Sequence, residues 1–167
     1  TTAFLKAEDG FELLGCTKFN NSMITNPVER YSALGFYFNQ SGKLRAKVIK
    51  NQTEVDLESV PAAFGGYFTI LEEGELLEYK KLKRSRMACG LDQEGRYLYV
   101  LAVTSKRILG RSGLSYEDCG ALLKAFGCTW GIQFDGGHSV GFVSPEFGYV
   151  HAKKNRAVPA ALGFYLK

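Results

Sequence analysis

The chain has 167 residues, of which 46% are hydrophobic, 13% aromatic and 23% charged. This composition excludes a disordered or fibrous protein and predicts one globular domain over residues 1–167, long enough to bury a full core without metal or disulfide staples. Nineteen glycines against four prolines favour a strand-rich fold over a helical bundle. The net charge of +4 is too small for a uniform nucleic-acid-binding surface.

The sequence carries no recognisable membrane span or export signal. No apolar run approaches the roughly 18 residues that a membrane-spanning helix needs. The first ten residues lack the basic-then-apolar order of a signal peptide. The chain begins at Thr1 and not at methionine, so the question whether a signal peptide or a first strand was removed upstream stays open. The compartment is therefore also an open question.

Short apolar and aromatic runs separated by glycine or asparagine predict a series of β-strands in the first two thirds of the chain. The predicted strands are residues 32–38, 43–49, 67–71, 76–79, 86–91 and 96–104. The polar tracts 39–42 and 72–75 predict that the first four strands pair as two hairpins. The run 96–104 is the most hydrophobic, so we expect it to be the central strand.

One helix is predicted, over residues 115–126. Ser115 is placed as its N-cap with Asp118 three residues on, a weaker form of the capping box. Gly127 is placed to end the helix in a left-handed conformation. Gly120 lies in mid-helix, where glycine costs about 1 kcal/mol relative to alanine, and we expect it to allow close packing of a strand. One apolar face is formed by Tyr116, Cys119, Leu122, Leu123 and Phe126.

Strand-like runs follow the helix at residues 129–134 and 140–143, and residues 157–166 are predicted as the final strand. Together with the preceding run, these predict one strand–helix–strand crossover, right-handed if its two strands are parallel. The loop 135–139 would then leave the carboxyl end of a strand, where ligands bind in open sheets. The fold class predicted is mixed α/β (α+β) with a mostly antiparallel sheet.

Four cysteines are spread through the sequence: Cys16, Cys89, Cys119 and Cys128. They form no C-x-x-C pair and have no histidine at zinc-ligand spacing, so no metal site and no cofactor are predicted. Cys119 and Cys128 would lie roughly 13 Å apart along a continuous helix, too far for a disulfide. We expect buried free thiols.

The loop Asp135-Gly136-Gly137-His138-Ser139 is the strongest candidate site. Its glycines allow backbone N–H groups to approach an anionic oxygen, and its flanking side chains can transfer or orient a proton. An ordinary hairpin turn explains the same five residues. The basic run 80–86 is interpreted as a solvated edge strand or turn. For Arg86, a surface ion pair and a contact with a phosphate explain the residue equally well.

The segments around this loop resemble the phosphodiester glycosidase family. The resemblance is continuous through RYLYVLAV (96–103), GLSYE (113–117), LLKAFGC (122–128) and GIQFDGGHS (131–139), and weaker matches lie at 21–23, 86–90 and 156–161. Gln133 replaces the leading asparagine of the family's loop, and His138 replaces its third glycine. The family's opening strand has no evident counterpart, so the domain is expected to lack it.

This resemblance implies hydrolysis of the sugar–phosphate bond of a sugar-1-phosphodiester, with a small glycosyl-phosphate as substrate and a secreted or periplasmic location. It assigns catalysis to Asp135 and His138. The residues implied to bind substrate are Asn21, Arg86, Gly136, Gly137, Ser139 and Arg156. Each has a structural alternative: a turn for Asp135 and Asn21, and surface ion pairs for the arginines.

Several points stay open at the level of sequence. A second carboxylate could be any of Glu72, Glu73, Glu75 and Glu146. The sugar, the leaving group, a divalent ion, the oligomeric state and the effect of Gln133 and His138 on activity are not determined. A non-catalytic carbohydrate- or nucleotide-binding module is one alternative function. A nucleic-acid-binding protein that stacks bases on Tyr79, Tyr97 and Tyr99 is another, disfavoured by the modest charge.

Overall fold

The computed structural model describes residues 3–7, 10–79, 81–104, 113–146, 148–153 and 157–165. Its elements, in chain order, are β1 (Ala3–Ala7), β2 (Gly10–Leu14), β3 (Thr17–Phe19), β4 (Ser22–Thr25), β5 (Ala33–Phe38), β6 (Leu44–Ile49), η1 (Val55–Leu57), β7 (Ala62–Gly65), β8 (Phe68–Glu72), β9 (Glu75–Leu76), β10 (Arg86–Leu91), β11 (Leu98–Val103), α1 (Tyr116–Ala125), β12 (Trp130–Gln133), η2 (Gly137–Ser139), β13 (Gly141–Ser144) and β14 (Gly148–His151).

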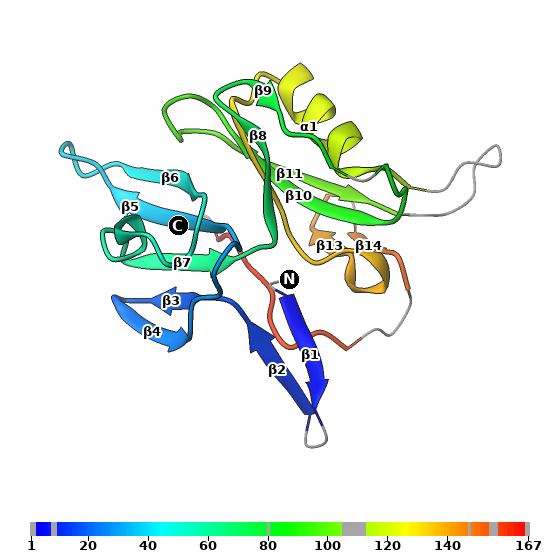
Figure 1. Ribbon diagram of the computed structural model, residues 1–167, viewed down its shortest axis with the longest axis horizontal. Helices are drawn as coiled ribbons and strands as arrows, with labels where there is room; N and C mark the ends of the chain where they lie inside the picture. The colour runs from blue at the N-terminus through cyan, green and yellow to red at the C-terminus, as the bar shows by residue number, and fades with distance from the viewer. Residues whose placement is uncertain are drawn as a thin grey trace.

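The described strands form two five-stranded sheets and two separate hairpins (Figure 1). The first sheet has the order β4-β3-β7-β5-β6, and the second the order β11-β10-β12-β8-β9. All neighbours in both sheets pair antiparallel. The pairs β1–β2 and β13–β14 form the hairpins. The predicted mixed fold is confirmed, with its strands divided between two sheets where the sequence had suggested one.

The predicted helix and its caps are confirmed. The Ser115 hydroxyl accepts from the Asp118 N–H, the Asp118 carboxylate accepts from the Ser115 N–H, and both ends of the capping box are therefore made. Gly127 follows the helix with φ +88°. A Cβ on Gly120 would lie 2.8 Å from the Ile70 carbonyl oxygen, so glycine at this position does allow α1 to pack closely on β8.

The strand–helix–strand unit is β11–α1–β12. Both strands are antiparallel to β10, which lies between them, so β11 and β12 are parallel to each other. The crossover therefore spans one intervening strand, and it directs the end of β12 and the loop 135–139 to the side where α1 begins.

Three apolar clusters fill the molecule. The largest lies between the two sheets, where Leu34 and Ala46 face Met87, Ile132 and others of the second sheet. A second, around Cys16, Ile49 and Leu57, lies on the far face of the first sheet. The third joins the second sheet to α1 and contains Ile70, Leu71, Ala88, Cys119, Leu123 and Cys128. The layers are thus α1, second sheet, first sheet and the η1 turn.

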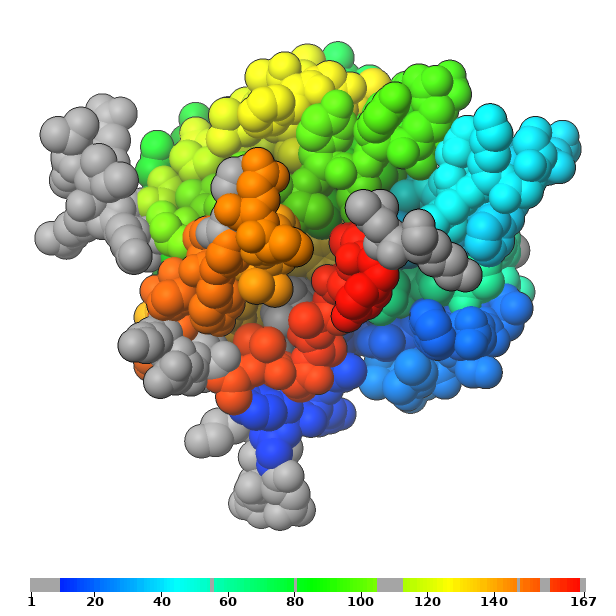
Figure 2. Space-filling model, turned by 180° about the vertical axis from the view of Figure 1, so that it is seen from behind, coloured from blue at the N-terminus to red at the C-terminus, as the bar shows by residue number. Residues whose placement is uncertain are grey.

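Two predictions were wrong. Residues 96–104 do not form the central strand: β11 is an edge strand whose residues are half-buried or exposed, and the shorter β12 is central. Residues 157–165 form no strand. Pro159 lacks the N–H that a ladder needs. This segment instead crosses the back of the molecule (red, Figure 2), where Leu162 packs on the core between the sheets and Phe164 contacts the Phe36 ring.

The hairpins 32–38 with 43–49 and 67–71 with 76–79 are both present, although β9 (Glu75–Leu76) contains only Leu76 of the predicted run 76–79. Among the described helices, none has the length and apolar character to cross a membrane.

Candidate functional site

The loop 135–139 is held against β10 by main-chain hydrogen bonds. After β12 ends at Gln133, the Phe134 N–H donates to the Met87 carbonyl at 2.7 Å, and the Gly137 N–H donates to the Ser85 carbonyl at 2.9 Å. A Cβ on Gly136 would lie 2.8 Å from the Ser85 carbonyl oxygen, so only glycine fits there without a shift. The loop therefore continues the sheet and presents Asp135 from a fixed backbone.

The Asp135 carboxylate is half-buried and uses one oxygen within its own turn. Its Oδ1 accepts from the Gly136 N–H at 2.9 Å. In the described part of the chain, its Oδ2 has no hydrogen-bond partner. One oxygen thus fixes the orientation of the carboxylate, and the other is available to a ligand.

Gln133, the residue that replaces the family's asparagine, is buried and fixes the end of β12. Its side-chain N–H groups donate to the Met87 and Phe134 carbonyls, both at 2.8 Å. Its Oε1 is buried and has no hydrogen-bond partner among the described residues. The longer side chain therefore holds the strand end while leaving one acceptor unused.

Tyr67 is brought to Asp135 by the segment that crosses from the first sheet to the second. A Cβ on Gly66 would lie 2.8 Å from the Gln133 carbonyl oxygen, so glycine is needed for the crossing. The next N–H, that of Tyr67, donates to the same carbonyl at 2.7 Å. Burial, the Asp135 charge and neighbouring tyrosines raise the pKa of Tyr67 to about 12. At neutral pH its hydroxyl therefore stays protonated and can donate.

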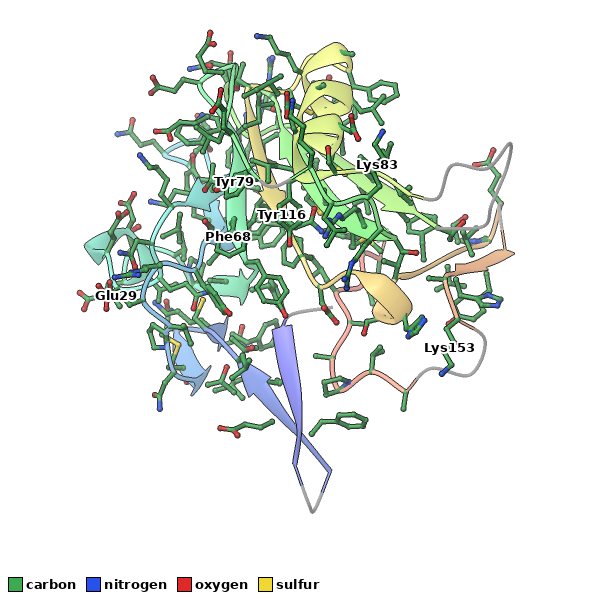
Figure 3. All side chains as sticks on the ribbon, turned by 45° about the vertical axis from the view of Figure 1, so that its right-hand side comes forward. Glu29, Phe68, Tyr79, Lys83, Tyr116 and Lys153 are labelled. Carbon is green, nitrogen blue, oxygen red and sulfur yellow. The ribbon has the colours of Figure 1, made fainter. Side chains whose placement is uncertain are left out.

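Five rings form an aromatic cluster that reaches Asp135 through Tyr67: Tyr31, Tyr67, Phe68, Tyr79 and Tyr116. Ring centroids are 5.2 Å apart for Tyr31–Tyr67, 5.6 Å for Phe68–Tyr79 and 5.6 Å for Tyr79–Tyr116. Figure 3 shows Phe68, Tyr79 and Tyr116 grouped at the start of α1. The Tyr79 hydroxyl donates to the Thr69 carbonyl. Within the described chain the other three hydroxyls have no partner, so the cluster combines apolar faces with free hydroxyl groups.

Arg86 is buried, and its guanidinium forms its hydrogen bonds within the protein. Its Nε donates to the Leu114 carbonyl at 3.0 Å, and its Nη2 donates to the Leu82 carbonyl at 2.6 Å. Its Cζ lies 4.0 Å from the centroid of the Tyr116 ring. No ion pair of Arg86 occurs among the described residues. In this structure Arg86 positions Tyr116 and the start of α1.

The other predicted site residues lie in different places. His138 is exposed on η2, and the buried Ser139 donates its N–H to the Gly136 carbonyl at 3.2 Å. Asn21 lies in the β3–β4 turn with φ +63°, on the far side of the molecule from η2 (Figure 1). The Gly136 and Gly137 N–H groups both donate within the protein. Arg156 lies outside the described residues.

The basic run is partly neutralised by the helix. Lys81 lies 3.8 Å from a carboxylate oxygen of Glu117, and Lys83 lies 3.4 Å from one of Asp118. These pairs offset two of the positive charges of the run, and Arg84 stays exposed.

A small cavity of about 180 Å³ adjoins the aromatic cluster and was not predicted. Phe68 and Tyr79 form one side, and Arg30 and Lys50 lie on the other. Lys50 forms an ion pair with Glu72 at 2.7 Å, whereas Arg30 is exposed and has no ion pair in the described structure. Arg30 has φ +68° at a turn closed by the Tyr31 N–H and the Val28 carbonyl, a conformation that favours glycine or asparagine.

The cysteines are buried and unpaired, as predicted. Burial raises the pKa of Cys16, Cys89 and Cys119 to about 12 and that of Cys128 to about 11, so these thiols are poor nucleophiles. In the described ranges, no group of three or more histidine, cysteine, aspartate or glutamate side chains is arranged to hold a metal.

Comparisons with known proteins agree with this architecture. The catalytic domain of zebrafish N-acetylglucosamine-1-phosphodiester alpha-N-acetylglucosaminidase, auto-inhibited by its pro-peptide, matches with a TM-score of 0.66 and 14% identity, over 95% of this chain and 57% of that one. A hypothetical protein from Synechocystis matches with a TM-score of 0.56 and 11% identity, over 84% of this chain and 46% of that one. The chain thus spans about half the length of these solved relatives.

At these identities the structural likeness establishes the fold alone. A search of curated proteins finds no sequence that matches the chain. The model of the family described as phosphodiester glycosidase matches residues 8–165, nearly the whole length. This match includes β10, α1, β12 and the Asp135 loop in one continuous alignment. The chain therefore belongs to the phosphodiester glycosidase family.

Proposed function

We propose that this chain hydrolyses the sugar–phosphate bond of a sugar-1-phosphodiester and releases a free sugar and a phosphomonoester. Family membership supports the reaction class. The observation that carries the proposal is the Asp135 Oδ2 beside an aromatic cluster with three hydroxyl groups, all of them without a hydrogen-bond partner among the residues that the structure describes.

Hydrolysis at an anomeric carbon proceeds through an oxocarbenium-like transition state, which a carboxylate stabilises. Asp135 supplies that carboxylate from a backbone fixed on β10, so little reorganisation is needed. The protonated Tyr67 hydroxyl can donate to a substrate oxygen nearby. The exposed His138, one turn from Asp135, can orient the attacking water.

The phosphate is a good leaving group and needs cationic contacts more than a strong acid. Arg86 is committed to two carbonyls, so its part in the proposal becomes positioning Tyr116. Arg30, with its free guanidinium at the cavity beside Phe68, is the cation that we assign to the anionic end of the substrate.

The test is turnover of an aryl or uridyl sugar-1-phosphodiester by the wild type, Asp135→Asn and the control Asp56→Asn. Asp56 is an exposed aspartate that pairs with Lys47 in the other sheet. We expect Asp135→Asn to lose at least about 100-fold in kcat with unchanged folding, and the control to keep full activity. Equal activity of the wild type and Asp135→Asn would refute the assignment.

A second candidate is a non-catalytic carbohydrate-binding module. It is favoured by the engagement of the Gly136 and Gly137 N–H groups and of the Arg86 guanidinium within the protein, which leaves few groups for a reacting phosphate. This function requires sugar binding without turnover. A wild type that binds sugar phosphates as tightly as Asp135→Asn and hydrolyses none would establish it.

A further inference from the structure

A second cavity, of about 240 Å³, lies at the opposite end of β12 from Asp135. It is enclosed by β6, by the turn that joins β10 to β11, and by the start of β12. Trp130 and Asp135 are five residues apart along an extended backbone, which separates them by roughly 17 Å. Its lining includes Tyr37, Lys47, Asp92, Gln93, Glu94 and Trp130.

The walls of this cavity are fixed before any ligand arrives. The Ala46 N–H donates to the Gly95 carbonyl at 2.9 Å, which attaches the β10–β11 turn to the edge of β6. A Cβ on Gly95 would lie 1.9 Å from the Ala46 carbonyl oxygen, so only glycine permits this contact. The Asp92 carboxylate accepts from the N–H groups of Arg96 and Tyr97 at 2.6 and 2.9 Å and thereby closes the turn.

The charges around the cavity are already paired. Lys47 lies 3.1 Å from Asp56, and the Arg96 guanidinium lies 3.2 Å from Asp92 and 3.3 Å from Glu94. Burial alone would raise the pKa of Asp92, but hydrogen bonds from Tyr97 and Arg96 outweigh burial and lower it. Each of these charged groups therefore has an ion-pair partner, and because one guanidinium serves two carboxylates the set keeps one excess negative charge, which disfavours an anionic ligand.

Its unpartnered groups are uncharged. The indole N–H of Trp130, the Tyr37 hydroxyl and the Gln93 amide make no hydrogen bond with other described residues. These three polar groups line the cavity together with the half-buried rings of Trp130 and Tyr37. Aromatic surface next to an amide, an indole N–H and a phenol matches a ligand with an apolar face and a rim of hydroxyl groups.

We propose that this cavity binds one pyranose ring of a neutral saccharide, with a C–H face of the ring on Trp130 and its hydroxyls on Gln93 and Tyr37. The volume is below the roughly 300–1,000 Å³ of drug-sized sites, which suits a single sugar unit. The site is independent of Asp135 and stands whether or not the chain is a hydrolase.

Trp130 is the only tryptophan of the chain, so tryptophan emission, excited selectively over that of the nine tyrosines, reports on this cavity. The wild type is titrated with glucose, galactose, mannose and N-acetylated hexosamines, with their di- and trisaccharides, and with glycerol as a non-saccharide control. We expect a saturable change in emission with a Kd on the order of 1 mM for at least one monosaccharide, because a hexose has few atoms with which to bind. Tighter binding of the di- and trisaccharides than of the monosaccharide would identify the ligand as part of a glycan chain. Equal binding of both would identify it as a free sugar.

Four variants keep Trp130 as the fluorescence reporter: two test the proposed contacts and two are controls. Gln93→Ala and Tyr37→Phe should each weaken binding about threefold to tenfold, as expected for one lost hydrogen bond. Gln40→Ala, an exposed glutamine of the β5–β6 turn outside the cavity, should bind as the wild type. Asp135→Asn should also leave this titration unchanged, which separates the cavity from the proposed catalytic site.

Three results would overturn the proposal: no saturable change with any saccharide, the same change with glycerol, or wild-type affinity in both Gln93→Ala and Tyr37→Phe. Circular dichroism of each variant confirms that the fold is retained. Hydrolysis of a sugar-1-phosphodiester is measured separately, so loss of that activity carries no information on this cavity.

Discussion

The guanidinium of Arg86 lies over the ring of Tyr116, with its central carbon 4.0 Å from the ring centroid. This contact joins the first residue of β10 to the first residue of α1 and fixes one wall of the aromatic cluster. It also explains why the buried arginine is not free to clamp a phosphate.

Arg86→Ala should destabilise the protein by about 2–4 kcal/mol, because it removes the stacking contact with Tyr116 and the side-chain donor to the Leu82 carbonyl. The Leu114 carbonyl loses one of its two donors and keeps the Arg84 N–H. Urea unfolding measures this loss. Arg84→Ala, at an exposed neighbouring position, should change stability by less than about 0.5 kcal/mol. If Arg86→Ala kept wild-type stability and lost only substrate binding, the guanidinium would be a ligand-binding group after all.

Arg30 has a left-handed backbone that costs an arginine roughly 1–2 kcal/mol. Arg30→Gly should relieve this strain and stabilise the protein by up to about 1 kcal/mol, part of the gain being offset by the flexibility of glycine in the unfolded chain. The same variant should bind inorganic phosphate and sugar phosphates more weakly, as measured by calorimetry. Arg30→Ala is the matched control, since it removes the charge and keeps the strain. Unchanged phosphate binding in both would exclude Arg30 from the anion site.

Gly120→Ala should destabilise the protein by about 1–3 kcal/mol, because the added methyl group meets the backbone of β8 at 2.8 Å from the Ile70 carbonyl oxygen. Helix propensity alone predicts the opposite sign, a gain of about 1 kcal/mol. Ala121→Gly, at an exposed helix position, measures that propensity at the neighbouring site. Thermal unfolding of both variants decides the sign, and a more stable Gly120→Ala would contradict the close contact.

Stability should fall at acid pH through Asp118. The hydrogen bond from the Ser115 N–H lowers its pKa, with burial opposing and Ser115 Oγ and Lys83 assisting. Because the folded pKa lies below the unfolded value of about 4, the stabilisation is present above that value and is lost as pH falls through the folded pKa. Asp118→Asn should reduce this acid sensitivity and cost about 1 kcal/mol at pH 7. The free energy of unfolding of Asp118→Asn is measured in urea at pH 7 and at pH 3. The control is Glu117→Gln, which lies outside the capping box and should keep the wild-type pH dependence.

Local signals in the sequence account for the parts that were predicted correctly. Ser115, Asp118 and Gly127 carry cap chemistry within one helix, and the 39–42 tract joins two strands that are neighbours in the chain. The position of β11 could not be read in this way, because hydrophobicity does not distinguish an edge strand under a helix from a central one.

The composition of the site depends on contacts between distant segments. The five rings of the aromatic cluster come from the segment before β5, the crossing between the sheets, β8, the segment after β9 and the first residue of α1. Nothing in the local sequence of Tyr31 or Tyr79 indicates that their rings belong to one cluster. The burial of Arg86 was missed for the same reason, since its partner Leu114 is 28 residues away in the sequence.

A main-chain hydrogen bond attaches the Asp135 loop to the segment that leads into β10, as neighbouring strands are attached in a sheet. The Gly137 amide is hydrogen-bonded to the Ser85 carbonyl, so its hydrogen can exchange with solvent only when that bond opens. The carboxylate is in consequence carried by a hydrogen-bonded segment, and a ligand meets a preformed site without waiting for a loop to close.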